Sequence, residues 1–320
     1  MQEVLKQIEA IGIVPVVKID HAEDAVPLAQ ALCDGGLPCA EVTFRTAAAA
    51  DAIKAISNAF PQMLVGAGTV LTTEQADAAM EAGAKFLVSP GLNPAVVHYC
   101  VEKGYPIAPG CANPSDIEQA LALGLDVVKF FPAEAAGGLP MIKAMSAPYG
   151  SLKFMPTGGI NASNLNTYLD FSKILACGGS WMVKADLINN GDFEGIRALT
   201  RQAVEEMLGF TVAHVGINCD SAEDARAVSG SFASLFGFAA KEGNSSVFAG
   251  TGIEVMKNGG LGAKGHIAVR TNYLNRAIAY LERQGIRFNQ DSAKFNAKGQ
   301  MVAIYLADEI GGFAVHLVQK

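Results

Sequence analysis

The strongest constraint on the fold is a regular alternation of short apolar segments with longer amphipathic ones between residues 13 and 180. The apolar segments recur roughly every 20–25 residues, and most end in Gly, Pro or Thr. They are IVPVV (13–17), CAEVTF (39–44), MLVGAGT (63–69), FLVSPG (86–91), PIAPGC (106–111), VVKFFP (127–132), KFMPTGG (153–159) and ILACGGS (174–180). Apolar strands that alternate with helices are typical of a parallel sheet covered by helices. Eight units in about 200 residues predict an α/β fold of the (β/α)8 TIM-barrel type, with an open doubly wound sheet as the alternative.

The segments between these strands carry helix signals. EDAVPLAQALCDGG (23–36) and TTEQADAAMEAGA (72–84) are amphipathic, and the second begins with a Thr cap and ends near Gly83. A final helix over residues 192–208 is expected to close the barrel.

Length and charge both indicate a second domain. The chain has 320 residues, whereas single cores stop growing at about 250–300 residues. Residues 1–209 carry 13 basic and 22 acidic side chains, a net charge of −9, but residues 210–320 carry 11 and 9, a net charge of +2. We therefore expect two domains, 1–208 and 210–320.

The C-terminal segment has its own pattern, in which two helices (221–236 and 271–284) separate groups of strand-like segments. The polar residues 286–300 are expected to hold a short strand and a loop. Strand, helix and three strands, followed by the same again, predict paired βαβββ modules in one small α+β domain. The strand-like segments are TVAHVGIN, SSVFAG, GIEVMK, GHIAVRT, MVAIYLA and GFAVHLVQ.

Composition excludes several classes of partner. The net charge of −7 argues against nucleic acid or an anionic membrane. No apolar run approaches the ~20 residues of a spanning helix, and the N-terminus lacks the order of a signal peptide. Six scattered cysteines without a CxxC pair indicate reduced thiols, so we expect a cytoplasmic protein with a small-molecule substrate.

Charged side chains lie inside two of the predicted strands. In AEVTFRT, the period of two places Glu41, Thr43 and Arg45 on one face of the strand, toward the barrel interior. In DVVKFFPAE, Lys129 lies in the most apolar strand of the chain. Burial of a lysine disfavours its ammonium form, and the neutral amine is the nucleophile of Schiff-base chemistry. The alternative is a Lys–Glu ion pair that only joins the core, but convergence of Lys129, Glu41 and Arg45 from separate strands favours a catalytic site.

Glycines follow the last two predicted barrel strands, in PTGGIN (156–161) and ACGGSW (176–181). Such glycines let backbone N–H groups approach a phosphate, and the N-termini of the helices that follow favour negative charge. A third strand end, GAGT, offers Thr69 as a hydrogen-bond donor to a carboxylate. Together these groups suit carbon–carbon bond cleavage through an imine on a phosphorylated 2-oxo acid.

Residues 1–208 closely resemble the aldolases that act on 2-dehydro-3-deoxy-6-phosphogluconate (KDPG) and 4-hydroxy-2-oxoglutarate (KHG). The matching motifs are AEVTFRT, VGAGTVLT, SPGLN, VVKFFPAEAAGG, FMPTGGI and CGGSW. The resemblance implies a metal-independent class I aldolase on a (β/α)8 barrel that assembles as a trimer. It makes Lys129 the Schiff-base lysine and Glu41 the proton shuttle, with Arg45 and Thr69 on the pyruvate carboxylate. The residues that it places at the phosphate are Thr157, Gly158, Gly159, Gly179, Ser180 and Lys18.

Three histidines and a glutamate lie in different strand-like segments of the second domain: His214, Glu254, His266 and His316. A single histidine in a strand is more often a hydrogen-bonded core residue, but four such groups with apolar neighbours indicate a metal site. Imidazole and carboxylate ligands suit Zn, Ni, Mn or Fe.

The second domain resembles the vicinal oxygen chelate superfamily, which includes glyoxalase I, at HVGI, IEV, GHIAV and GFAVHLV. That family takes its metal ligands from these strands, but its last ligand is usually a glutamate where this chain has His316. Three interpretations follow. The second domain is a metal-binding accessory or regulatory module of an aldolase, or it is an independent metalloenzyme acting on a related oxo compound. In the third, the barrel is a phosphosugar-binding or non-aldolase enzyme of similar architecture.

Overall fold

A computed structural model describes residues 2–320 of the chain, which divide into two compact units, a first unit that ends at Met207 and a second unit that spans Leu208–Lys320. The strands of the first unit are β1 (Ile13–Val17), β2 (Cys39–Thr43), β3 (Leu64–Gly68), β4 (Phe86–Val88), β5 (Ile107–Ala108), β6 (Val127–Phe130), β7 (Lys153–Pro156) and β8 (Cys177–Gly179). Its helices are α1 (Gln2–Ile11), η1 (Ala22–Asp24), α2 (Ala25–Asp34), α3 (Ala49–Ala59), α4 (Thr73–Glu81), α5 (Pro94–Lys103), α6 (Pro114–Ala122), α7 (Gly138–Ser146), α8 (Leu165–Leu169), α9 (Ala185–Asn189) and α10 (Phe193–Leu208), the last of which crosses the boundary between the units.

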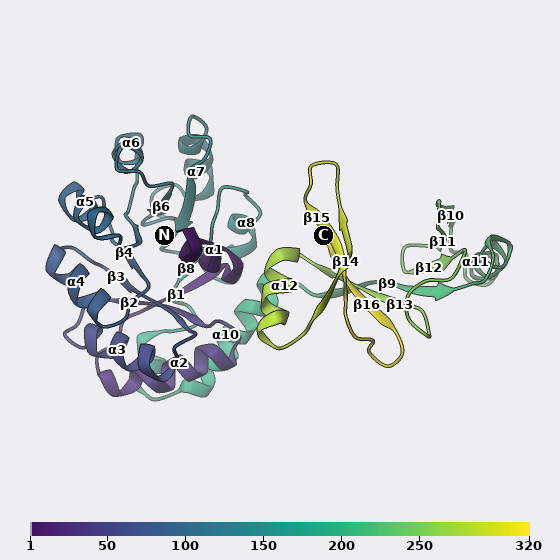
Figure 1. Cartoon of the computed structure of the whole chain (residues 1–320), viewed down its shortest axis with the longest axis horizontal. Helices are drawn as coiled ribbons and strands as arrows, with labels where there is room; N and C mark the ends of the chain where they lie inside the picture. The colour runs from purple at the N-terminus through teal and green to yellow at the C-terminus, as the bar shows by residue number, and fades with distance from the viewer. Residues whose placement is uncertain (1) are drawn as a thin grey trace. The chain divides into compact units, whose positions relative to one another are not determined.

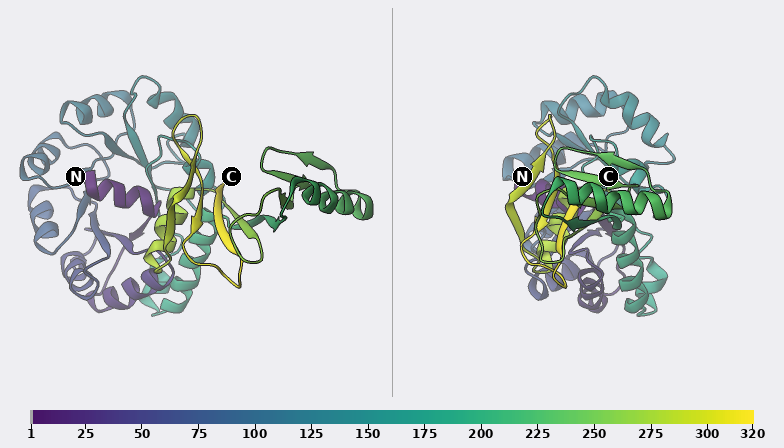
Figure 2. Two further views of the ribbon diagram at one scale, coloured as in Figure 1. Left: turned by 45° about the vertical axis from the view of Figure 1, so that its right-hand side comes forward. Right: turned by 90° about the vertical axis from the view of Figure 1, so that its right-hand side faces the viewer.

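The first unit is an α/β fold of the (β/α)8 barrel type. Strands β5-β4-β3-β2-β1-β8 pair in that order as one parallel sheet, and β6 pairs with β7. Parallel bridges from Gly110 to Lys129 and from Thr157 to Gly178 join β6 and β7 to the two ends of the larger sheet. An open doubly wound sheet would leave two edge strands, so these bridges favour the barrel. The helices surround the strands (Figures 1 and 2).

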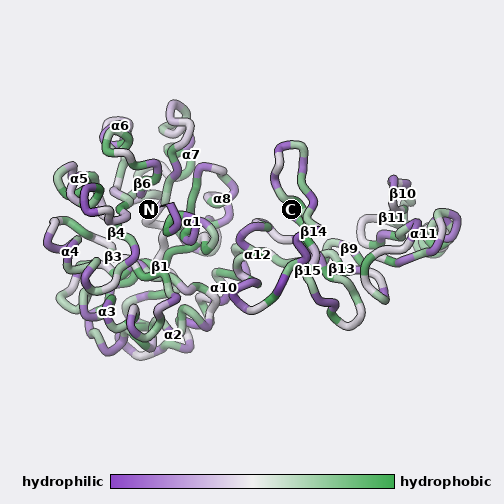
Figure 3. The backbone as a smooth tube through the Cα atoms, in the orientation of Figure 1, coloured by the Kyte–Doolittle hydropathy of each residue, from purple (hydrophilic) through white to green (hydrophobic). Residues whose placement is uncertain are grey.

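Local signals place several helix ends close to the expected positions. The Thr72 side chain accepts a hydrogen bond from the backbone N–H of Gln75 and so caps α4. Gly83 has a φ of +102°, which only glycine adopts without strain, and it turns the chain after that helix. Hydrophobic and hydrophilic residues alternate along the helices (Figure 3), while every residue of β1, β2 and β3 is buried.

The second unit contains one eight-stranded sheet. Its strands are β9 (Thr211–Asn218), β10 (Ala240–Glu242), β11 (Ser246–Ala249), β12 (Ile253–Met256), β13 (His266–Thr271), β14 (Phe288–Phe295), β15 (Met301–Leu306) and β16 (Ala314–Gln319), with helices α11 (Ala222–Phe236) and α12 (Leu274–Arg283). The strand order is β10-β11-β12-β9-β13-β16-β15-β14. Each half is therefore a βαβββ module with the same internal order, and the antiparallel pair β9–β13 joins the two halves.

Two parts of this unit differ from the sequence expectation. The short, exposed strand β10 was not expected, because its residues AKE carry no apolar pattern. The polar segment expected to hold a short strand forms the eight-residue β14, which pairs with β15 through a register shift. Both strands lie at the edges of the sheet, where burial does not dictate an apolar pattern. Among residues 2–320, no helix is long and apolar enough to cross a membrane.

Candidate active site and metal centre

Lys129 and Glu41 meet inside the barrel. Lys129 lies on β6 and Glu41 on β2, with the Lys129 Nζ 3.3 Å from the Glu41 Oε1. Both residues are buried, at 5% and 1% exposure. Hydrogen bonds to the neighbouring strand end fix the lysine backbone, since its N–H donates to the Pro109 carbonyl and its carbonyl accepts from the Cys111 N–H. An amine and a carboxylate held together out of water can exchange a proton, which an imine-forming site requires.

The end of β3 shapes the space around Glu41. A Cβ atom added to Gly68 would lie 2.2 Å from the Glu41 Oε1, so only glycine leaves room for the carboxylate. The next residue, Thr69, has a φ of +58°, a left-handed conformation that is strained for a β-branched side chain. Such strain is typical of functional sites. The motif GAGT pointed to Thr69, but it gave no sign that Gly68 accommodates Glu41.

Arg45 lies nearby but not where the strand alternation placed it. Strand β2 ends at Thr43, and Arg45 follows in a turn, exposed to solvent. Its Nε donates a hydrogen bond of 3.1 Å to the Thr43 Oγ1, and that hydroxyl donates to the Val17 carbonyl. Thr43 therefore links Arg45 to the buried part of the site.

The proposed phosphate residues lie at neighbouring strand ends. Thr157 follows β7 and forms a bridge with Gly178 of β8. Gly158 and Gly159 have φ values of +100° and +82°, which explains why the turn contains two glycines. Ser180 follows β8 directly. The helices that follow these turns begin several residues further on, α8 at Leu165 and α9 at Ala185.

Lys18 follows β1, the strand in which Pro15 pairs with Gly179 of β8. The Lys18 Nζ forms an ion pair of 2.6 Å with the Asp20 Oδ1. The sequence did not predict one contact of the lysine with an aromatic ring: the Lys129 Nζ lies 5.2 Å from the centre of the Phe131 ring. The consecutive phenylalanines of VVKFFP were its only signal.

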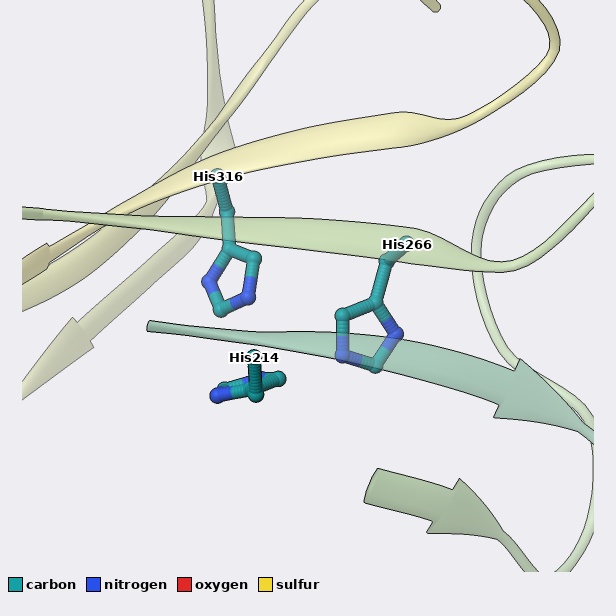
Figure 4. Close-up of side chains that lie close together, drawn as sticks. All are labelled: His214, His266 and His316. Atoms are coloured by element: carbon teal, nitrogen blue, oxygen red, sulfur yellow. The ribbon is translucent and has the colours of Figure 1, made fainter. Parts of the chain in front are cut away.

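The second unit brings together all four expected metal ligands. His214 lies on β9, Glu254 on β12, His266 on β13 and His316 on β16. One nitrogen from each of the three imidazoles lies within 4.8 Å of the other two. The three rings lie close together at steep angles to one another (Figure 4). The Glu254 Oε2 lies 3.1 Å from the His214 Nε2 and 3.2 Å from the His266 Nε2.

Neighbouring groups fix this cluster. The Ser246 hydroxyl donates a hydrogen bond of 2.6 Å to the Glu254 Oε1, which leaves Oε2 for the histidines. Hydrogen bonds to the imidazoles of His214, which has the larger effect, and His266 hold the pKa of Glu254 well below its usual range. Burial lowers the pKa of His316 to about 3, so this ring is neutral at pH 7. Its two ring nitrogens have no hydrogen-bond partner among residues 2–320. A neutral, unpaired imidazole beside a carboxylate fits a divalent metal.

The barrel and the buried lysine–carboxylate pair define a lyase of the Schiff-base class. The sequence matches the family described as KDPG and KHG aldolase over residues 2–199, and the chain belongs to this family. The third interpretation, a barrel with a non-aldolase activity, is therefore wrong. The family match ends before the second unit begins.

Individual relatives cover the same part of the chain. The chain is 51% identical to 2-dehydro-3-deoxy-phosphogluconate aldolase of Treponema pallidum, over 64% of this chain and 98% of the relative. It is 44% identical to the KHG/KDPG aldolase of Escherichia coli K12, over 60% and 91%. A crystal structure of KDPG aldolase from Legionella pneumophila, with pyruvate captured as a covalent carbinolamine, superposes with a TM-score of 0.60 at 40% identity and covers 62% of this chain and 97% of that one.

Proposed function

We propose that the first unit cleaves KDPG to pyruvate and glyceraldehyde 3-phosphate through a Schiff base on Lys129, and that it also cleaves KHG to pyruvate and glyoxylate. The observation that carries this proposal is the buried contact between the Lys129 Nζ and the Glu41 Oε1. The names of the relatives support the two substrates. The class I chemistry uses no metal, because the positive imine acts as the electron sink.

The reaction follows from these two groups. The Lys129 amine adds to the C2 ketone, and Glu41 shuttles the protons for loss of water to the iminium ion. Glu41, directly or through a water, then accepts the C4 hydroxyl proton as the C3–C4 bond breaks, and the bonding electrons form the enamine. Glyceraldehyde 3-phosphate leaves. Glu41 returns a proton to C3, and hydrolysis of the imine releases pyruvate and the free amine.

The remaining site residues bind the two ends of the substrate. Arg45 and Thr69 take the carboxylate of the pyruvate portion, since a guanidinium and a hydroxyl both donate to it. Backbone N–H groups at glycine-rich turns suit a phosphate. The phosphate residues in this proposal are Thr157, Gly158, Gly159, Gly179, Ser180 and Lys18. A coupled assay with both 2-oxo acids tests the activity, and blank assays with a folded protein would contradict it.

Replacing Gly68 by alanine is expected to reduce kcat by about 100-fold, because displacing a catalytic group by about 1 Å has an effect of that size. The added Cβ would lie 2.2 Å from the Glu41 Oε1 and would push the carboxylate away from Lys129. Steady-state kinetics would measure the loss. The matched control is Gly150→Ala, where a Cβ meets no atom within 4 Å. Unchanged kcat in Gly68→Ala would show that the position of the carboxylate is not critical.

The second candidate function is divalent metal binding by the second unit, with His214, Glu254, His266 and His316 as ligands. The unpaired ring nitrogens of His316 favour it. The paired βαβββ modules support assignment to a glyoxalase-like vicinal oxygen chelate domain. A bound metal would supply Lewis-acid chemistry if the unit is an enzyme, and a regulatory or accessory module would use it for structure.

We also propose that the chain assembles as a homotrimer through the barrel.

One equivalent of Zn, Ni, Mn or Fe is expected to bind per chain and to raise the melting temperature of the second unit. A ligand that binds only the folded state stabilises it by about 2.7 kcal/mol when its free concentration is 100 times Kd. Metal analysis and calorimetry of the full chain would measure both effects. His316→Ala should lose them, whereas His98→Ala, which removes an exposed histidine beside Glu102, should retain them. A wild-type chain without stoichiometric metal would contradict the metal centre. Chelation should leave KDPG cleavage unchanged.

A further inference from the structure

One side-chain pair, a buried tyrosine and an exposed glutamate, lies beside the proposed phosphate-binding turn formed by Thr157, Gly158 and Gly159 (the phosphate turn) and has no role in the reaction described above. Tyr168 lies on α8 with 2% exposure, and its hydroxyl donates a hydrogen bond to the Glu134 Oε1. Glu134 lies in the turn after β6, the strand that carries Lys129. The pair therefore spans from the lysine strand to the helix that follows the phosphate turn.

The turn that carries Glu134 is also bonded directly to the phosphate turn. The Ala133 N–H donates to the Thr157 carbonyl at 2.8 Å, and the Glu134 N–H donates to the Gly158 carbonyl at 3.0 Å. The Gly159 carbonyl accepts from the Asn164 Nδ2 at 3.1 Å. Three backbone carbonyls of the phosphate turn are therefore already hydrogen-bonded to donors of the protein. Their oxygens do not face an incoming anion as free acceptors.

Side-chain packing makes the position of Glu134 specific. A Cβ atom on Gly159 would lie 2.5 Å from the Glu134 Cγ, so the glutamate lies flat against the phosphate turn. A Cβ atom on Gly138 would lie 3.1 Å from the Tyr168 Oη and 3.2 Å from the Glu134 Oε1. Two glycines with positive φ therefore surround the pair. Burial and the carboxylate both hold the pKa of Tyr168 well above its usual range, so its hydroxyl keeps the proton that it donates.

We infer that Glu134 and Tyr168 are positioning residues that fix the phosphate turn relative to Lys129 and so set the preference for a phosphorylated 2-oxo acid. This inference rests on the proposed function. KDPG must reach Lys129 with C2 and the phosphate turn with its C6 phosphate, so its binding depends on the separation of the two points. KHG has no phosphate and ends in a carboxylate at C5, so it depends less on that separation.

The test compares kcat/KM for the two substrates in the full-length protein. Tyr168→Phe should raise the KM for KDPG about tenfold, as loss of a hydrogen bond to a charged group does, with kcat little changed. Its kcat/KM for KHG and borohydride trapping with pyruvate should stay at wild-type values. Glu134→Ala should shift the substrate ratio in the same direction, and the double variant should not add the two effects. Glu134→Gln keeps an acceptor oxygen and the packing against Gly159, so it should preserve the ratio.

The matched control is Tyr149→Phe, because the Tyr149 hydroxyl also hydrogen-bonds a glutamate, Glu118, but on the surface away from the turn. It should leave both substrates unaffected. If Tyr168→Phe does not fold, Glu134→Ala carries the test, because Glu134 is exposed. An unchanged substrate ratio in folded variants, or an equal loss with both substrates, would overturn the inference. A wild-type protein that fails to cleave KDPG would instead overturn the proposed function, and the inference with it.

Discussion

Lys129→Ala is expected to reduce KDPG cleavage by at least about 10⁴-fold, because removing a covalent nucleophile eliminates the route through the imine. The substitution leaves Glu41 buried at 1% exposure without its partner. Borohydride with pyruvate should label the wild-type chain at Lys129 and should leave the variant unlabelled, as mass spectrometry would show.

A control is needed because losing one member of a buried ion pair also destabilises the fold. Lys153→Ala removes a lysine from the neighbouring strand β7, where the side chain is partly exposed and pairs with Glu9. This variant should keep its activity and its label. A folded Lys129→Ala chain that still formed the pyruvate adduct would disprove the Schiff-base assignment.

Glu41→Gln is expected to lower kcat by about 10²–10⁴-fold, the usual contribution of general acid–base catalysis. Glutamine keeps the size of the side chain in the space that Gly68 leaves, but it cannot shuttle protons. Pyruvate binding should weaken less than turnover slows, because the nucleophile and the carboxylate-binding residues are unchanged. The measurements are kcat for KDPG and the inhibition constant for pyruvate.

Glu102→Gln provides the comparison, since Glu102 is exposed and pairs with His98 on the surface. It should affect neither quantity. If Glu41→Gln weakened pyruvate binding as much as it slowed turnover, Glu41 would be a binding residue and another group would move the protons.

The barrel and its central pair could be predicted because their signals lie within single strands. The segment VVKFF is apolar on both sides of Lys129, and a lysine in such a strand is costly unless it is paired or used. The alternation in AEVTF likewise placed Glu41 and Thr43 on one face, and the structure has both buried. The alternation misplaced Arg45 because the strand ends at Thr43.

The supporting residues could not be predicted because their roles depend on contacts between distant segments. Gly68 makes room for Glu41 because β2 and β3 pair with Thr43 opposite Gly68, and a glycine before Thr69 is compatible with many turns. In the segment NLNTYLDF, nothing distinguishes Tyr168 from an ordinary aromatic residue of the core. Only the packing of α8 brings its hydroxyl to Glu134.

The sequence by itself determined the alternation of strands and helices, the identity of the buried lysine and the four metal-ligand candidates, because hydrophobic periodicity and residue chemistry are local properties. Tertiary structure alone decided which groups meet. Lys129 and Glu41 are 88 residues apart in the chain, and the strand order of the barrel places them 3.3 Å apart. His214 and His316 lie on strands that both pair with β13, opposite the same residue, Ala268, so their rings share one face of the sheet. The physical reason is that strand pairing fixes register and facing direction across long sequence separations, which no local pattern encodes.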